Sequence, residues 1–347
     1  NSEEGIVSDG RTRRKGAGRR PFVEHHPDVI KAIEKIIDGR TYGDPSKMLH
    51  WVPQSMSLRK IEAILIDEYG IQVSYVKVSQ LLTDMGYSKQ VNQKMLQAGE
   101  PSPDRDEQFG LINDLAKQYL EAGDPMISVD TKKKENIGNF KNNGAEYRKT
   151  KDPRKVWDHD FPVAELGKVN PYGVYVLNSN TGFINLGTDH DTSEFAVASI
   201  AAWWDSCGKN SFPEARRIYI TCDGSGSNSS RSRAWKCGLQ KLADYTGLEI
   251  MVSHYPPGAS KWNKIEHRMF CYISKNWQGK PLIDIETVVS LISNTTTQNG
   301  LKIDCLVDNN VYPIGRKVSD DELAQVNHIP YERLGRWNYT IMPNCKE

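Results

Sequence analysis

The 347-residue chain has no long hydrophobic run and no excess of one charge. No apolar stretch approaches the roughly 18 residues that a membrane-spanning helix needs, and no signal peptide opens the sequence. We therefore expect no membrane partner and a cytoplasmic protein. The 45 basic and 44 acidic residues leave a net charge of +1. Any affinity for nucleic acid must then come from local clusters of charge.

Paired metal-binding cysteines are also missing. The six cysteines are scattered, with no CxxC pair and no Cys/His spacing typical of zinc sites. Single thiols suit a reduced compartment and small packing roles. The glycine-rich segment 224–228 lacks the GK[ST] of a phosphate-binding loop, and Ser253-His254 lacks a nucleophile elbow. These absences argue against a zinc protein, a P-loop enzyme and a serine hydrolase.

Two local clusters of basic residues are present. Residues 11–20 contain six Lys or Arg and no acid, ending in Arg19 and Arg20. We interpret residues 1–26 as a flexible basic arm whose segment 18–21 lies in a DNA minor groove, although a plain disordered tail explains the composition equally well. The second cluster, 132–155, has nine basic and three acidic residues, a net +6, and begins with Lys132, Lys133 and Lys134. We expect it to follow a DNA backbone.

Residues 27–100 have apolar side chains at helical spacing. Ser57 and Ser74 stand where N-caps of two helices are expected, and a short connection at 69–73 separates these helices. This arrangement predicts a helix-turn-helix DNA-binding domain. Its second helix would present Tyr75, Lys77 and Gln80 to base edges and phosphates. Helix pairs that bind no DNA show the same pattern.

After a connecting segment, 101–125, which is predicted to hold a linker helix, the apolar period changes from helical to alternating. The predicted element order over 126–300 is β-β-β-α-β-α-β-α. This is the ribonuclease H-like order, an α/β fold with a mixed sheet covered on both faces. Residues 301–347 are expected to form a C-terminal extension. The strands are expected at 126–130, 172–177, 183–186, 217–222 and 249–254, and the helices at 193–204, 229–245 and 261–277.

Three carboxylates are candidates for chemistry. Asp130 ends the first predicted strand and Asp223 ends the fourth. In this fold the first and fourth strands are parallel neighbours, so the two side chains would lie side by side. Glu266 falls within an apolar stripe of the last helix, where a charge is costly unless a cation meets it. The stripe is formed by Trp262, Met269, Phe270 and Ile273.

The residues around Glu266 extend this candidate site. Asn263, one turn earlier, is placed to hydrogen-bond the carboxylate or to support a metal ligand from behind. His267 and Arg268 are more consistent with phosphate contacts than with metal ligation. Oxygen ligands suit Mg²⁺ or Mn²⁺. Two such ions neutralise the attacking and leaving oxygens in phosphodiester transfer. A strand-end Asp also commonly caps a turn or pairs with a lysine such as Lys132.

Several sequence strings resemble the Rhodopirellula-type DDE transposases, the ISAzo-thirteen insertion-sequence group of the ribonuclease H-like superfamily. The resemblance runs from about residue 16 to residue 341. The strings that carry it are Ile127–Glu135, Gly138–Asn142, His159–Phe161, Pro171–Tyr175, Asp189–Thr192, Asp223–Asn228, His254–Gly258, Ser260–Arg268 and Trp337–Thr340.

The resemblance implies a metal-dependent triad of Asp130, Asp223 and Glu266. It also implies recognition of terminal inverted repeats, strand transfer into target DNA, and work as a homo-oligomer on DNA. Two other readings stay open at this point. One is a catalytically silent DNA-binding protein derived from a transposase, and the other is a ribonuclease H-like nuclease.

Overall fold

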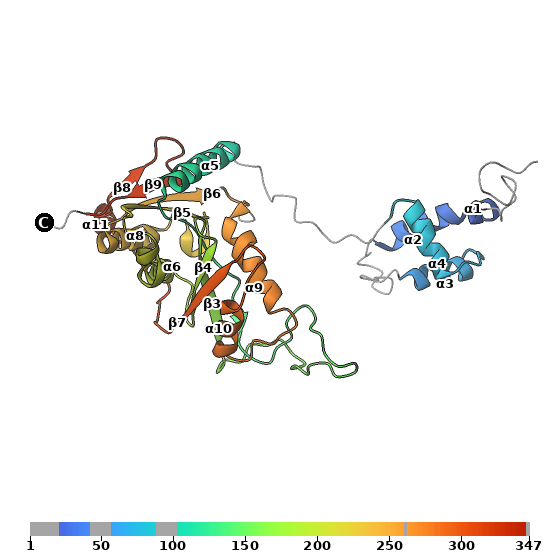
Figure 1. The fold of residues 1–347 in the computed structure, drawn as a ribbon. Helices are drawn as coiled ribbons and strands as arrows, with labels where there is room; N and C mark the ends of the chain where they lie inside the picture. The colour runs from blue at the N-terminus through green and yellow to red at the C-terminus, as the bar shows by residue number, and fades with distance from the viewer. Residues whose placement is uncertain (1–20, 42–56, 88–102, 260–261, 345–347) are drawn as a thin grey trace, which may run out of the picture. The chain divides into compact units, whose positions relative to one another are not determined.

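The computed structural model describes residues 21–41, 57–87, 103–259 and 262–344, with side chains omitted for 38–41. The chain divides into two compact units, Asn1–Met95 and Leu96–Glu347 (Figure 1). No helix in the described ranges has both the length and the apolar character needed to span a membrane. The five cysteines within those ranges are free thiols.

The first unit is helical. Its helices are α1 (Phe22–His25), α2 (Val29–Thr41), α3 (Leu58–Asp67) and α4 (Tyr75–Asp84). The side-chain oxygens of Ser57 and Ser74 accept hydrogen bonds from the third residue of each following helix, as their capping positions predict. Apolar residues of α2, α3 and α4 form one core.

The connection between α3 and α4 is a tight turn. Gly70 has a φ of +67°, a left-handed conformation that glycine adopts without strain. The amide of Ile71 donates to the carbonyl of Leu65 at 2.8 Å. Val78 and Leu81 then face the core while Tyr75 and Gln80 remain exposed. The local pattern of the predicted helix pair is therefore present.

One boundary of the predicted basic arm is wrong. Residues 22–25 form α1, and Phe22 packs against the core of the first unit. The expected arm therefore does not extend to residue 26. Arg19 and Arg20 lie outside the described residues.

The second unit is built on one mixed sheet with the strand order β7-β4-β3-β1-β5-β6-β9-β8, to which the short β2 adds by pairing with β3. Its central part, β4-β3-β1-β5-β6, is the predicted ribonuclease H-like arrangement: β3 is antiparallel to β1 and β4, whereas β1, β5 and β6 are parallel. The strands are β1 (Met126–Thr131), β2 (Glu135–Asn136), β3 (Lys168–Val176), β4 (Thr181–Gly187), β5 (Arg217–Asp223), β6 (Glu249–Tyr255), β7 (Lys302–Asp308), β8 (His328–Pro330) and β9 (Asn338–Ile341).

Helices cover both faces of this sheet (Figure 1). The largest apolar core lies under α6 (Ser193–Trp203) and α8 (Arg233–Thr246). The opposite face is covered by α5 (Arg105–Ala122), by a π-helical turn η5 (Glu266–Phe270) that continues into α9 (Cys271–Asn276), and by α10 (Ile285–Ser293). Shorter elements complete the unit: η2 (Trp204–Gly208), α7 (Lys209–Ser211), η3 (Gly226–Asn228) and α11 (Asp320–Ala324).

Two predicted boundaries of the second unit are wrong. The helix expected as a linker is α5, whose Leu111, Leu115 and Tyr119 pack against the sheet. The expected C-terminal extension supplies β7 at one edge of the sheet and β9 and β8 at the other. Both segments therefore belong to the fold of the second unit, because their apolar side chains pack against partners far away in the sequence.

Gly173 allows η5 to approach the sheet. It lies opposite Asp130 on the neighbouring strand. A Cβ atom at this position would stand 2.6 Å from Phe270 Cε1 and 2.8 Å from Ile265 Cδ1. Such distances are too short for carbon atoms, so the helix that carries Glu266 would have to move.

We expect Gly173→Ala to lower the free energy of unfolding by about 1–3 kcal/mol, the usual cost of overpacking a core. Thermal and denaturant unfolding measure this change. Gly110→Ala in α5 is the matched control because its Cβ would meet no atom within 4 Å. Since alanine favours a helix over glycine, the control is expected to be neutral or stabilising. Equal stability of Gly173→Ala and the wild type would contradict the packing argument.

Candidate active site

Asp130 is the penultimate residue of β1 and Asp223 is the last residue of β5, the adjacent parallel strand. The pairing of β1 with β5 runs up to Val129 and Cys222, so the next residue on each strand is the aspartate. Side chains alternate between the faces of a sheet. Because Met126 and Tyr219 pack under α5, Asp130 and Asp223 also point to that face. The strand order alone predicted this proximity.

Glu266 reaches the same face from the helical segment above it. It is the first residue of η5, and the amide of Cys271 donates to its carbonyl, which gives the wide π-helical turn. π-helical turns inside helices are frequent at functional sites. Ile265, Met269, Phe270 and Ile273 are buried around it. Trp262, predicted to share this apolar stripe, is instead 50% exposed.

Asn263 ties this helical segment to β1. Its side-chain amide donates to the carbonyl of Val129 at 3.1 Å, and its oxygen accepts from the hydroxyl of Ser128 at 2.5 Å. The same hydroxyl accepts from the amide of Ile265 at 3.1 Å. Asn263 also hydrogen-bonds Asp130. The amide therefore contacts Asp130, whereas the hydrogen bond expected from its spacing was to Glu266; its alternative role, supporting a metal ligand from behind, stays a prediction.

The pKa values of all three carboxylates are raised, chiefly by burial. Burial, together with the charges of Asp223 and Glu266, raises the pKa of Asp130 from 3.8 to about 8, against the opposing effect of hydrogen bonds from Thr131 and Asn263. Burial and the charge of Glu266 raise the pKa of Asp223, and burial raises that of Glu266. Such a cluster favours either a shared proton or a bound cation.

The donor set fits a hard divalent cation. Asp223 Oδ1 is buried and has no hydrogen-bond partner, so one carboxylate oxygen is left to bind a ligand. All three side chains offer oxygen, which Mg²⁺ and Mn²⁺ prefer. Within the described ranges, no three His, Cys, Asp or Glu side chains are drawn together closely enough to enclose an ion.

Lys132 is a structural residue and not a surface contact. Only 7% of it is exposed. Its ammonium donates to Glu135 at 2.8 Å and lies 4.1 Å from the centre of the Trp277 ring. Its charge also lowers the pKa of Glu266. The predicted DNA contact at Lys132 is therefore wrong, because local charge counting could not anticipate the distant partner Trp277.

The rest of the basic segment stands outside the sheet. Residues 137–167 form an extended loop between β2 and β3 (Figure 1). Lys133 and Lys134, at the start of the basic segment and just before β2, are exposed. Arg148 pairs with Glu146 and Asp152, and Arg154 pairs with Glu146. These ion pairs leave the net charge of the segment unchanged, but they engage Arg148 and Arg154 with acids of the same loop.

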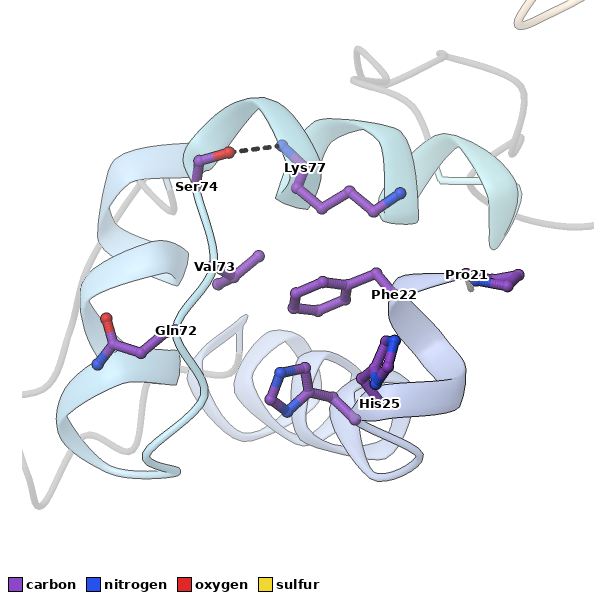
Figure 2. A pocket seen from close by; sticks show the side chains of 8 residues that line it. Pro21, Phe22, His25, Gln72, Val73, Ser74 and Lys77 are labelled. Carbon is purple, nitrogen blue, oxygen red and sulfur yellow. Dashed lines mark hydrogen bonds between the residues drawn. The ribbon is translucent and has the colours of Figure 1, made fainter. Parts of the chain in front are cut away.

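The first unit has a cleft of about 860 Å³ beside the start of α4. Figure 2 shows Phe22 and His25 of α1 on one side of it, and Lys77 of α4 with the N-cap residue Ser74 on the other. The amide of Lys77 is capped by Ser74, and its ammonium donates to Gln80 at 2.9 Å. Tyr75, 42% exposed, lies under the guanidinium of Arg59. His25 was missed from the sequence because it was assigned to the arm.

Comparison with known proteins identifies the family. The family model described as "Rhodopirellula transposase DDE domain" matches residues 32–343. The chain belongs to this family. Among solved structures, the Mos1 transposase paired-end complex with left transposon end has a TM-score of 0.42 and 13% identity, covering 81% of this chain and 72% of that one. The pre-cleavage Mos1 transpososome has a TM-score of 0.42 and 13% identity, covering 81% of this chain and 73% of that one. No curated protein sequence matches.

In this DDE-domain chain a buried polar network supports Asp223 from the opposite face of the sheet. His254 Nδ1 lies 3.1 Å from the Asp223 carbonyl oxygen, and His254 Nε2 lies 3.0 Å from the Tyr339 hydroxyl. The indole of Trp235 donates to the same hydroxyl at 2.9 Å. Burial lowers the pKa of His254 to about 4, so the ring is neutral at pH 7.

Sequence reasoning missed this network and Ser128. Ser128 had a usable signal, since it lies two residues before Asp130 and therefore on the same face of β1. His254 had no usable signal in the sequence, because its partner Tyr339 lies 85 residues further along the chain. His267 and Arg268 are both exposed at the start of η5.

Proposed function

We propose that this family member cleaves and joins DNA strands with Asp130, Asp223 and Glu266 as the metal-binding catalytic residues. The observation that carries the proposal is the placement of three mutually repelling carboxylates on one face of the sheet, with a buried Asp223 oxygen left unpartnered. Two Mg²⁺ or Mn²⁺ ions, when bound, would neutralise charge on the attacking and leaving oxygens of a phosphodiester.

The chain's own residues would fix the geometry of this reaction. Asn263 and Ser128 hold the Glu266 helix to β1 beside Asp130. Lys132 would compensate part of the negative charge when no cation is present, because its charge favours the ionised form of Glu266. His267 and Arg268, exposed beside Glu266, would contact the phosphates on either side of the reacting one.

The first unit would hold the element's terminal inverted repeats. Tyr75, Lys77 and Gln80 of α4 would face the major groove, and Arg19 and Arg20 would follow the minor groove. Lys133 and Lys134 would lie along the DNA backbone that leads to the carboxylates. Target DNA is the second nucleic-acid substrate, and we propose that a homo-oligomer acts on the DNA in the cytoplasm.

The test is strand nicking and transfer on duplex DNA that carries the element's own ends. We expect the full-length chain to nick and join DNA with Mg²⁺ or Mn²⁺ and to do neither after chelation of the metal. Ca²⁺ is a useful control, since it also prefers oxygen ligands but binds them with a looser geometry.

Binding to the ends without any cleavage in Mg²⁺ or Mn²⁺ would favour a silent DNA-binding protein. Cleavage of hybrids or junctions in preference to the ends would favour a general nuclease. Either result would overturn the transposase proposal.

A further inference from the structure

A cleft of about 400 Å³ lies on the α5 face of the second unit. Phe109 and Arg105 of α5 form one side of it, and Tyr255 at the end of β6 lies beside them. Trp262 and Lys264, which precede η5, form the other side. The nicking and joining chemistry proposed above gives this cleft no role.

The cleft is lined by three aromatic rings at van der Waals spacing. The centroid of Phe109 lies 6.0 Å from that of Tyr255 and 6.0 Å from that of Trp262. Tyr255 is 4% exposed and forms the floor, whereas Trp262 is 50% exposed. A large apolar ring at such an exposed position gains little from the protein's own core. It offers a surface on which a flat ligand stacks.

Two residues that line the cleft lie next to the carboxylates or to residues that contact them. Tyr255 is the strand partner of Asp223 in the pairing of β5 with β6. Trp262 immediately precedes Asn263, which bonds the backbone of β1 beside Asp130. A group that occupies the cleft is therefore close to whatever phosphodiester the carboxylates hold.

The rim of the cleft is cationic. The guanidinium of Arg105 lies 5.8 Å from the centre of the Phe109 ring, and Lys264 is exposed beside it. One acid, Asp106, also lines the cleft. Aromatic rings with flanking cations form the surfaces on which proteins stack unpaired bases while contacting the attached phosphates.

We propose that this cleft binds an unpaired base of the DNA strand whose phosphodiester lies at the carboxylates. A base within a duplex has both faces stacked, so it must leave the helix to enter such a cleft. The inference rests on the proposed function for the identity of the DNA, but not on catalysis itself. Trp262 would be a substrate-positioning residue, with Phe109 and Tyr255 as the supporting rings.

Binding of two DNA probes to the full-length chain tests this proposal. One probe is a blunt duplex of the element's end, and the other is the same duplex with a short unpaired tail that carries 2-aminopurine. We expect the wild type to prefer the tailed probe and to quench its fluorescence. Trp262→Ala is expected to lower affinity for the tailed probe by about tenfold, as for one lost base–aromatic stack. Affinity for the blunt probe should not change.

Two further variants make the outcome specific. Trp262→Phe keeps an aromatic face and is expected to retain most of the tail preference. Tyr245→Ala on α8 removes a 63% exposed ring from the opposite side of the sheet and should behave as wild type. Equal tail preference in Trp262→Ala and the wild type would overturn the inference, whereas metal-dependent nicking in the same preparations would still support the proposed function. If instead Trp262→Ala lowers the tail preference but the wild type does not nick DNA, the inference about the cleft would stand and the proposed function would fail.

Discussion

Glu266→Gln is expected to reduce metal-dependent strand cleavage by about three orders of magnitude or more, because it removes the charge of one of the three carboxylates proposed to hold the metal ions at the reacting phosphodiester. The substitution keeps the size of the side chain and its place in η5. It also removes the carboxylate that raises the pKa values of Asp130 and Asp223. The variant should therefore fold well and still bind DNA ends.

The measurement is nicking of end-bearing duplex in Mg²⁺, run beside a filter or mobility-shift binding assay on the same DNA. Glu286→Gln is the matched control, since Glu286 is an exposed residue in the first turn of α10. It should cleave as the wild type does. If Glu266→Gln and Glu286→Gln cleave equally well, Glu266 is not a metal ligand and the active-site assignment fails.

Asp130→Asn is expected to stabilise the metal-free protein at pH 8 and to have little effect near pH 4. The pKa of Asp130 is about 8 in the folded chain and 3.8 in its ordinary state. Between these values the folded state binds a proton that the unfolded state has released, so the free energy of unfolding falls as pH rises. One pKa unit corresponds to about 1.4 kcal/mol, and we expect a gain of a few kcal/mol at pH 8.

Unfolding in denaturant with a metal chelator, at several pH values, measures this effect. Asp284→Asn serves as a control of opposite sign. Asp284 caps α10, and hydrogen bonds from Thr287 lower its pKa, so its contribution to stability is present above that pKa. Its replacement should stabilise at no pH. If the Asp130→Asn variant is less stable than the wild type at every pH measured, the ionised Asp130 does not destabilise the folded protein and its pKa is not raised.

The sequence predicted those parts of the fold and of the site that depend on residues close together along the chain. Alternating apolar residues placed Asp130 and Asp223 at strand ends, and the ribonuclease H-like order made those strands neighbours. The apolar neighbours of Glu266 marked it as an unusual carboxylate. The N-caps at Ser57 and Ser74 likewise follow from contacts within three residues along the chain.

Features that depend on distant partners were not predictable. Lys132 belongs to a run of lysines, and its contacts with Glu135 and the distant Trp277 distinguish it from its exposed neighbours. Trp262 fits the helical stripe by spacing, yet the regular helix begins after it. The strands β8 and β9 are short, so their apolar period is too brief to identify without the β6 edge that they extend.

The position of β9 ties the maturation of the catalytic unit to the order of synthesis. β9 pairs with β6, and its Tyr339 closes the hydrogen-bonded chain behind Asp223. β7 likewise fills the far edge beside β4. A nascent chain that has produced all three carboxylates still has two open sheet edges, which cannot yet support a stable core. We therefore expect the second unit to become stable only after β9 has been made, and chains that stop before it to be degraded or to aggregate.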